Sequence, residues 1–242
     1  MGCYQGNDQY YVAVDCIIFG FDAGELKLLI LKRKFQPAKG NWSLTGGFLK
    51  QEESLDEGAR RILKKLTGLT NIFMEQMQCY SAIDRDPGDR TISVAYFALI
   101  KVDDNDRKRA ETFGAHWIGV KELPSLIFDH NIMVNKALRT LRHRVSTKPV
   151  GFELLPEKFT LPQFQSLYEA IYQEPLEKRN FRKQILQTGL LVKLDEKEKE
   201  SSKKGAFFYR FNKEMYATFV KRGFHFQMKV KKDSLIKMNA PI

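Results

Sequence analysis

The hydrophobic pattern changes period along the chain and divides it into two parts. In the first part, segments rich in apolar and β-branched residues predict strands at 10–21, 26–33, 77–83, 91–102 and 116–120. The Gly46–Gly47 pair within 42–48 allows tight backbone geometry. A polar turn at 22–25 makes the first two strands a hairpin. One helix is predicted at 131–145, because apolar residues recur there on a single face. These elements predict a mixed α/β (α+β) domain.

Terminal signals predict a further helix between these strands. Ser54 can cap it, and Glu57, three residues later, completes a capping box. Gly68 follows Thr67 as the expected C-terminal stop. The polar segment 84–90 and the charged segment 103–111 carry no clear period, so both are expected to be loops.

The second part follows a plausible linker at 146–149. Thr160 can cap a helix that runs to Tyr172, and a second helix is predicted from Glu177 to Thr188, ended by Gly189. Strands are predicted at 190–194 and 206–212, with a charged tip between them. Helix, turn, helix and hairpin is the order of a winged helix. We therefore expect domains at residues 1–148 and 149–242.

Charge and composition restrict the partners and the compartment. The chain of 242 residues has a net charge of +11, and residues 151–242 carry 18 Lys and Arg against 11 Asp and Glu. A basic domain suggests a polyanion such as nucleic acid. The three cysteines lack zinc-site spacing, and Cys16 lies in an apolar run. No apolar run reaches the ~20 residues of a membrane span, and residues 1–9 do not resemble a secretory signal. We expect a cytoplasmic protein with no membrane contact.

Residues 47–69 resemble the Nudix box, G-x5-E-x7-R-E-U-x-E-E-x-G-U, where U is a bulky aliphatic residue. The positions that match are Gly47, Glu53, Arg61, Leu63, Gly68 and Leu69. Segments 28–33 and 41–47 are also Nudix-like, and 84–97 resembles the ADP-ribose-type branch. The resemblance covers roughly residues 10–145 and implies a Nudix sandwich.

The box lacks its metal-binding glutamates. Active relatives place carboxylates on one helical face to hold Mg²⁺, and the matching positions here are Ile62, Lys65 and Leu66. Two apolar groups offer no oxygen, and an ammonium repels the ion. Rescue by Glu52, Glu53, Asp56 or Glu57 stays open as an alternative. We expect no catalytic residues, no metal and no cofactor, and hence a protein that is not an enzyme.

A Nudix pocket without its metal can still bind a small effector. The residues expected to line it are Arg33, Trp42, Glu53, Asp84 and Arg90. The resemblance places Arg33 and Trp42, whereas Asp84 and Arg90 come from the polar loop between two strands. For each residue, packing in the core or pairing at the surface is the competing interpretation.

The second helix of the basic domain carries the strongest sign of DNA binding. Phe181 and Ile185 share its packing face, while the remaining surface carries Lys178, Arg179, Asn180, Arg182 and Lys183. Cations near a helix N-terminus oppose its dipole at about 0.3–1 kcal/mol each, so the arrangement favours contacts with phosphate and bases. Lys203, Lys204 and Arg210 could act as a wing, which three nearby glutamates would oppose.

Taken whole, the chain resembles the Nudix-related transcriptional regulators, a Nudix sandwich with a C-terminal winged helix-turn-helix domain. The resemblance implies a homodimer that binds double-stranded operator DNA, as repressor or activator, under a small effector. One branch senses ADP-ribose and controls NAD metabolism. Another, with a degraded box, senses L-arabinose, and the missing glutamates favour this branch. The alternatives are ADP-ribose sensing, an active Mg²⁺-dependent pyrophosphatase, and a Nudix domain that acts only as a dimerisation scaffold.

Overall fold

The computed structural model describes residues 6–147, 151–199 and 205–221. The chain divides into two compact units, the Nudix unit (1–20 and 27–137) and the winged helix unit (138–242 with 21–26). None of the helices in these described ranges is long and apolar enough to cross a membrane.

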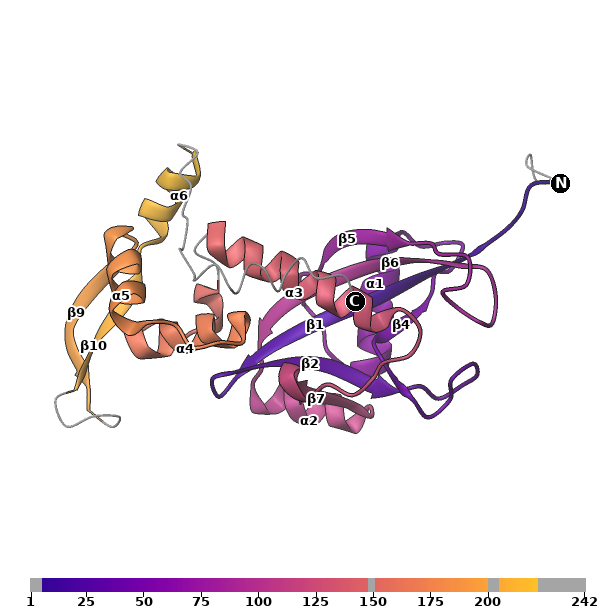
Figure 1. Ribbon diagram of the computed structural model, residues 1–242, viewed down its shortest axis with the longest axis horizontal. Coiled ribbons are helices and arrows are strands. Elements are labelled where there is room, and N and C mark those ends of the chain that lie inside the picture. The colour runs from indigo at the N-terminus through magenta and orange to yellow at the C-terminus, as the bar shows by residue number, and fades with distance from the viewer. Residues whose placement is uncertain (1–5, 148–150, 200–204, 222–242) are drawn as a thin grey trace. The chain divides into compact units, whose positions relative to one another are not determined.

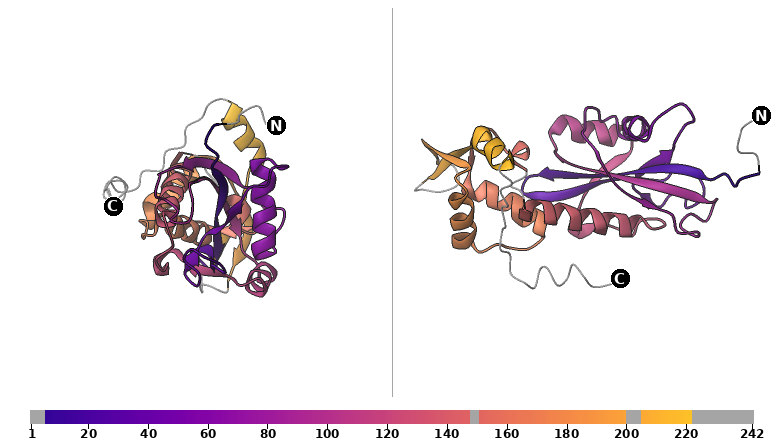
Figure 2. Two further views of the ribbon diagram at one scale, coloured as in Figure 1. Left: turned by 90° about the vertical axis from the view of Figure 1, so that its right-hand side faces the viewer. Right: turned by 90° about the horizontal axis from the view of Figure 1, so that it is seen from above.

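The Nudix unit is a seven-stranded sheet with helices on both faces (Figures 1 and 2). Its path is β3-β2-β1-β6-β5, while β4 pairs with β1 and β7 with β2. The strands are β1 (Tyr11–Asp22), β2 (Glu25–Lys32), β3 (Trp42–Ser43), β4 (Thr45–Phe48), β5 (Glu75–Tyr80), β6 (Thr91–Lys101) and β7 (Ala115–Gly119). Figure 2 shows α1 (Leu55–Thr67) and α2 (Asp104–Thr112) on one face and the first part of α3 (His130–Thr147) on the other. A 3₁₀ turn, η1 (Val120–Glu122), follows β7.

Strand β1 is buried on both faces because helices cover both sides of the sheet. Val14, Cys16 and Ile18 pack toward α1, where Ile62 and Leu63 belong to the same core cluster. The predicted strands are confirmed in order, although β5 begins two residues and ends three residues before the predicted segment. The short strands β3 and β4 lie in 42–48, where the sequence did not predict them. Asp15 is therefore a buried charged residue within an otherwise apolar strand.

Helix α1 begins and ends as predicted. The Ser54 hydroxyl accepts a bond from the Glu57 amide, and the Glu57 carboxylate accepts one from the Ser54 amide at 2.8 Å. Gly68 adopts a left-handed conformation (φ 71°) and donates its N–H to the Lys64 carbonyl. Both ends are satisfied by local contacts, which is why the sequence predicted them correctly.

The expected loop at 103–111 is wrong, because most of this segment forms α2. Asp103 caps the helix by accepting a bond from the Asp106 amide at 2.8 Å. Ala110 is its only fully buried residue, so the segment shows almost no apolar period. A capped helix that contributes one small side chain to the core has too weak a pattern for sequence reasoning.

The winged helix unit has a three-stranded sheet in the order β8-β10-β9. Its elements are η2 (Phe152–Leu154), β8 (Phe159–Thr160), α4 (Leu161–Tyr172), α5 (Lys178–Gln187), β9 (Leu191–Glu198), β10 (Ala206–Phe211) and α6 (Lys213–Lys221). The sequence predicted α4, α5 and both long strands, although β9 extends four residues beyond its predicted end. It missed β8 and α6. The predicted linker also begins too early, because α3 continues to Thr147.

Aromatic side chains form the core of this unit. Phe164 lies 4.9 Å from Tyr168 and 5.7 Å from Phe181, measured between ring centroids. Phe181 and Ile185 are both buried, so α5 packs on α4 through the predicted face. The cationic residues of α5 are consequently left on the outer surface.

Candidate functional site

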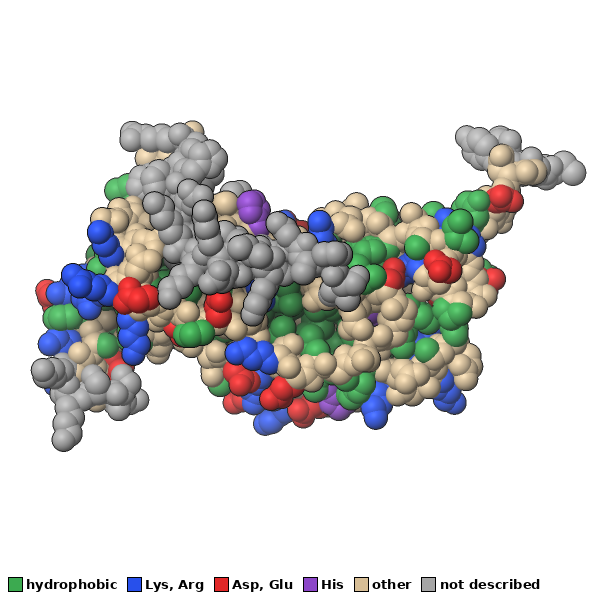
Figure 3. Space-filling model, viewed as in Figure 1, with side chains coloured by type: hydrophobic (Ala, Val, Ile, Leu, Met, Phe, Trp, Pro, Cys, Tyr) green, Lys and Arg blue, Asp and Glu red, His purple; other side chains and the backbone are tan. Residues whose placement is uncertain are grey.

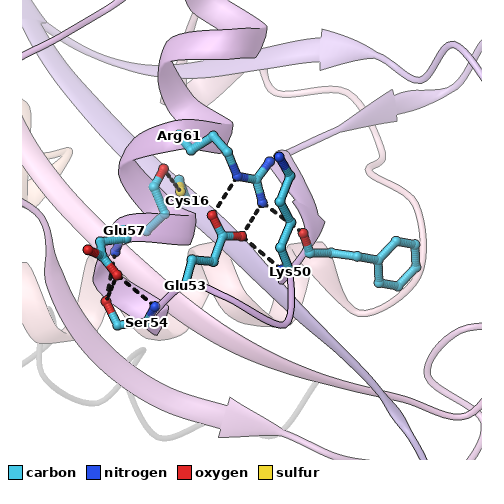
Figure 4. Close-up of polar contacts among 8 residues, drawn as sticks. Cys16, Lys50, Glu53, Ser54, Glu57 and Arg61 are labelled. Atoms are coloured by element: carbon cyan, nitrogen blue, oxygen red, sulfur yellow. Dashed lines mark hydrogen bonds and ion pairs between the residues drawn. The ribbon is translucent and has the colours of Figure 1, made fainter.

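The Nudix-box helix holds its nearest glutamate in an internal ion pair (Figure 4). Glu53 accepts bonds from the Arg61 guanidinium, with Nε at 2.7 Å, and from the Lys50 amide at 2.8 Å. The Arg61 bond is the main reason that the pKa of Glu53 is lowered to about 2. Arg61 also donates to the Phe48 carbonyl at 3.0 Å. Glu53 therefore ties the loop before α1 to the helix.

The helix face that would carry metal ligands is apolar. Ile62 is 3% exposed and lies against Gly47, whose Cβ would stand 3.4 Å from it. Leu66 packs against the same core, and Lys65 is exposed. Within the described ranges, no group of three His, Cys, Asp or Glu side chains is arranged to hold a metal ion.

Three of the four carboxylates that could rescue the site have other partners, and the fourth, Glu52, is exposed in the loop before α1. Asp56 accepts a bond from the Tyr96 hydroxyl at 2.6 Å, and Glu57 is engaged in the capping box of α1. Glu53 is bound by Arg61. The residues present at the Nudix box therefore do not fit Mg²⁺, which needs several oxygens directed at one point.

A small open pocket lies near β1, β3, β4, the 84–90 loop and the start of α3. It combines two arginines, two aspartates and a histidine with three phenylalanines. Its lining residues are Ala13, Asp15, Arg33, Phe35, Ser43, Gly46, Gly47, Phe48, Arg85, Asp86, Thr91, Phe128 and His130. Charged groups beside aromatic walls suit a polar ligand that has a flat ring.

The floor of this pocket is a buried polar cluster around Asp15. The carboxylate accepts a bond from the Ser93 hydroxyl at 2.5 Å. Arg85 Nη2 and His130 Nε2 each lie 3.6 Å from one of its oxygens. The Arg85 guanidinium makes two hydrogen bonds to Asp129, at 2.8 and 2.9 Å, and its side chain is 2% exposed. Buried charges are thus paired across the sheet, the loop and α3.

His130 has a defined tautomer in this cluster. Its Nδ1 accepts a bond from the Leu44 amide at 3.2 Å, so the neutral ring carries its hydrogen on Nε2. Burial lowers the pKa of His130, although Asp15 and Asp129 oppose that shift. Near neutral pH the ring therefore directs an N–H toward Asp15.

Arg33 and two aromatic rings form one wall of the pocket. The guanidinium carbon of Arg33 lies 4.2 Å from the ring centroid of Phe35 and 5.4 Å from that of Phe128. Burial lowers the pKa of Arg33, and the charges of Asp86 and Asp15 oppose this shift. Its Nε is buried without a hydrogen-bond partner among the residues that the structure describes.

Of the five predicted effector residues, the structure brings only Arg33 into the pocket. Trp42 stacks edge-on with His116, and Glu53 pairs with Arg61. Arg90 donates to the Ser81 and Ala82 carbonyls, and Asp84 is exposed on the loop; neither lines the pocket.

Sequence reasoning missed Asp15, Arg85 and His130. One signal was available, because Asp15 is the only charged residue in the apolar run 10–21. A charge inside an otherwise buried strand needs a partner, and the position therefore pointed to a polar site.

The winged helix unit presents the cationic face of α5. Lys178, Arg179, Asn180, Arg182 and Lys183 are all exposed. Figure 3 shows Lys and Arg side chains gathered over α5 and β9. Glu177 caps the helix by accepting bonds from the Arg179 and Asn180 amides at 2.8 and 2.6 Å, which satisfies backbone donors that would otherwise be unpaired.

The wing carries additional cations that the sequence did not single out. Lys193 and Lys197 on β9 lie 3.6 and 4.5 Å from the ring centroid of Phe207. Lys158 pairs with Glu196 at 2.8 Å, which offsets one of the glutamates expected to oppose phosphate. Of the predicted wing residues, Arg210 is exposed on β10, whereas Lys203 and Lys204 lie outside the described residues.

Comparison with known proteins agrees with this two-part architecture. Residues 9–140 match the NUDIX domain family, and residues 151–211 match the NrtR DNA-binding winged helix domain. The chain is 31% identical to the ADPR responsive transcriptional repressor NtrR of Acinetobacter baylyi, over 83% of this chain and 81% of that protein. It is 35% identical to the ADP-ribose pyrophosphatase of Methanocaldococcus jannaschii, over 53% of this chain and 73% of that protein.

A solved structure resembles both units. The crystal structure of Shewanella oneidensis NrtR complexed with a 27mer DNA matches with a TM-score of 0.71 and 25% identity, over 90% of this chain and 99% of that one. The Nudix sandwich followed by a winged helix, predicted from the sequence, is thereby confirmed. The chain belongs to the family of NrtR-like transcriptional regulators, in which a NUDIX domain precedes an NrtR DNA-binding winged helix domain.

Proposed function

We propose that this protein is a transcriptional repressor that binds operator DNA through α5 and releases it when ADP-ribose occupies the pocket of the Nudix unit. The observation that carries the proposal is the exposed cationic face of α5, on a helix whose opposite face is buried by Phe181 and Ile185. A helix buried on one side and cationic on the other can enter a major groove without unfolding the domain.

The choice of effector reverses the preference drawn from the sequence. The missing glutamates favoured the L-arabinose branch, but a relative that matches 83% of this chain is a repressor responsive to ADP-ribose. The pocket supports the same choice, because Arg33 and the rings of Phe35 and Phe128 offer a cation and flat apolar surfaces side by side. A pyrophosphate and an adenine need those two kinds of group.

We further propose that the Nudix unit binds this ligand without hydrolysing it. Ile62 and Leu66 replace carboxylates with apolar side chains, and Glu53, Asp56 and Glu57 are engaged by other partners. A pyrophosphatase is the second candidate, since the chain is 35% identical to an archaeal ADP-ribose pyrophosphatase. Turnover of ADP-ribose with Mg²⁺ that falls when Glu53 becomes Gln would support the hydrolase instead.

The proposed repressor acts as a homodimer, as the sequence led us to expect. Two copies of α5 would read half-sites of a pseudo-palindrome, separated by one or more helical turns of DNA. Sedimentation of the full chain with and without operator tests this arrangement, which predicts two chains per operator. A single chain on each operator would contradict it.

The decisive experiment measures operator binding by fluorescence anisotropy, with duplexes selected from a random library by the full chain. The double variant R179A/R182A is expected to lose specific binding, and the slope of log K against log salt should fall by up to about 2. A matched control is R60A/R107A, which removes two cations from the Nudix unit. Equal losses in both variants would contradict the interface.

The effector is tested in the same assay. ADP-ribose is expected to release the DNA from the wild-type complex, while L-arabinose at the same concentration leaves it bound. Release by L-arabinose alone would restore the preference drawn from the sequence. DNA binding unaffected by either compound would leave the Nudix unit as a scaffold and would contradict the proposed control.

A further inference from the structure

Arg142 on α3 binds the C-terminal end of α4 within the winged helix unit. Its Nε donates a hydrogen bond to the Ile171 carbonyl at 3.1 Å. Ile171 lies in the last turn of α4, where the backbone carbonyls have no acceptor role inside the helix. Arg142 is partly buried, and burial lowers its pKa. The guanidinium also stands at the negative end of the α4 dipole, so it stabilises this helix end twice.

The same guanidinium balances a charge in the turn between α4 and α5. Glu174 lies in this turn, and its Oε1 is buried without a hydrogen-bond partner among the residues that the structure describes. After burial, the charge of Glu174 is the next largest influence on the pKa of Arg142, and it raises that pKa. A buried carboxylate oxygen without a hydrogen bond needs a nearby cation. Arg142 therefore holds the turn by charge as well as by its hydrogen bond.

The other end of the turn is fixed by α4 itself. Gln165 donates to the Leu176 carbonyl at 3.0 Å, and the Glu169 carboxylate accepts a bond from the Leu176 amide at 2.9 Å. Glu177 follows and caps α5. The segment 173–177 thus places the cationic helix, and it has one anchor on α4 and one on α3.

Helix α3 begins at the pocket of the Nudix unit. His130, its first residue, lines that pocket, and the preceding Asp129 pairs with Arg85, which also lines it. The helix belongs to both units, with residues 130–137 in the Nudix unit and the remainder in the winged helix unit. Arg142 follows His130 by about 18 Å of helix, at a rise of 1.5 Å per residue. A ligand that displaces the start of α3 therefore also displaces Arg142, because the helix is continuously hydrogen-bonded.

We propose that Arg142 is a positioning residue for operator binding, through which α3 sets the α4–α5 turn and thereby the place of α5. Effector in the pocket moves the start of α3, loosens the hold of Arg142 on the turn and weakens DNA binding. The inference rests on the proposed function, because it needs a repressor that ADP-ribose releases from DNA. Arg142 acts through the turn and does not itself bind phosphate.

Operator affinity of the full chain, with and without saturating ADP-ribose, tests this role. Arg142→Met keeps the length of the side chain and removes its donor and its charge. Without ADP-ribose it should weaken operator binding about 10-fold, because the Ile171 carbonyl and Glu174 lose their partner. ADP-ribose should weaken operator binding of the wild type roughly 5–150-fold, and that of the variant less than about twofold. Arg142→Lys restores a cation and a donor and should recover most of both quantities.

The salt dependence separates positioning from direct contact with DNA. A lost phosphate contact would lower the slope of log K against log salt by about 1, whereas Arg142→Met should leave it within about 0.3 of the wild type. Lys121→Met removes one exposed cation of the Nudix unit and should change neither the slope nor the affinity.

Gln165→Met is the matched control for the turn. It removes the bond to the Leu176 carbonyl from α4 and leaves α3 untouched. It should weaken operator binding, as Arg142→Met does, but the response to ADP-ribose should stay at the wild-type value. A merely structural Arg142 would give the same result as Gln165→Met, which would overturn the inference.

Folding and effector binding are checked in the same variants. Circular dichroism verifies folding, and calorimetry should give an affinity for ADP-ribose within about twofold of the wild type, since no pocket residue changes. R142M/E174Q leaves no carboxylate without its cation and replaces Arg142→Met if that variant does not fold. An Arg142 variant that keeps the wild-type response, or a slope lowered by about 1, overturns the inference. If ADP-ribose does not release the wild type from DNA, the proposed function fails instead; the positioning role then depends on operator affinity alone, and an unchanged affinity in Arg142→Met overturns it.

Discussion

The buried pair of Arg85 and Asp129 offers the sharpest test of how the pocket floor is held together. Replacing Asp129 with Ala removes two charge-assisted hydrogen bonds from a guanidinium that is 2% exposed. Breaking a buried ion pair from one side costs roughly 3–5 kcal/mol. Because Asp15 remains 3.6 Å from the guanidinium, we expect the lower end of that range, about 3 kcal/mol of unfolding free energy.

Tryptophan fluorescence during urea unfolding measures this loss in the relevant unit. The chain has two tryptophans, Trp42 and Trp117, and both belong to the Nudix unit. In a thermal scan the same loss corresponds to a decrease in Tm of roughly 6–12 °C, at about 2–4 °C per kcal/mol for a chain of this size. Because neither tryptophan belongs to the winged helix unit, the fluorescence change reports unfolding of the Nudix unit even if the two units unfold separately.

Two further variants identify the cause of the loss. Asp104→Ala breaks an exposed ion pair with Arg107, in which Asp104 is 83% exposed, and should cost less than about 0.5 kcal/mol. The triple variant D15N/D129L/R85M leaves no formal charge of this cluster on the pocket floor and should be more stable than Asp129→Ala alone. A loss below about 1 kcal/mol in Asp129→Ala, or a triple variant that is less stable than the single one, would refute the reasoning.

Three other predictions follow from local geometry. Gly46→Ala should lower the unfolding free energy by roughly 1–3 kcal/mol, because the new Cβ would collide with Asp15 Oδ1. Gly47→Ala should cost less, because its Cβ would lie 3.4 Å from the Ile62 side chain. Urea titration that ranks the two variants in the opposite order contradicts this prediction. Thr160→Ala removes the cap of α4 and should cost about 1 kcal/mol, measured by far-UV circular dichroism, and no change would mean that the cap is not formed in solution. Since burial lowers the folded pKa of His130, the unfolded chain takes up its proton first, and stability should fall as pH drops below about 6.5. His130→Asn should flatten the fluorescence-monitored stability between pH 7 and 5, and an unchanged slope would contradict this.

Features that depend on neighbours in the chain were predictable from the sequence. The capping box of α1, its glycine stop, the cap of α4 and the packing face of α5 all arise from residues within a few positions of one another. The spacing of the Nudix box likewise identified the fold. Helix α2 was missed because it buries only Ala110 and therefore has almost no apolar period.

The pocket of the Nudix unit was decided by tertiary structure. Asp15 meets Ser93 across 78 positions of sequence, and Arg85 meets Asp129 across 44. Sequence patterns report which face of an element is apolar, but they do not report which distant polar side chain meets it. Glu53 lies at its position in the Nudix box and Trp42 in a Nudix-like segment, yet Trp42 contacts His116 edge-to-face and Glu53 pairs with Arg61. Strand pairing and helix packing brought the charges together, because a buried charge is stable only where the fold supplies its partner.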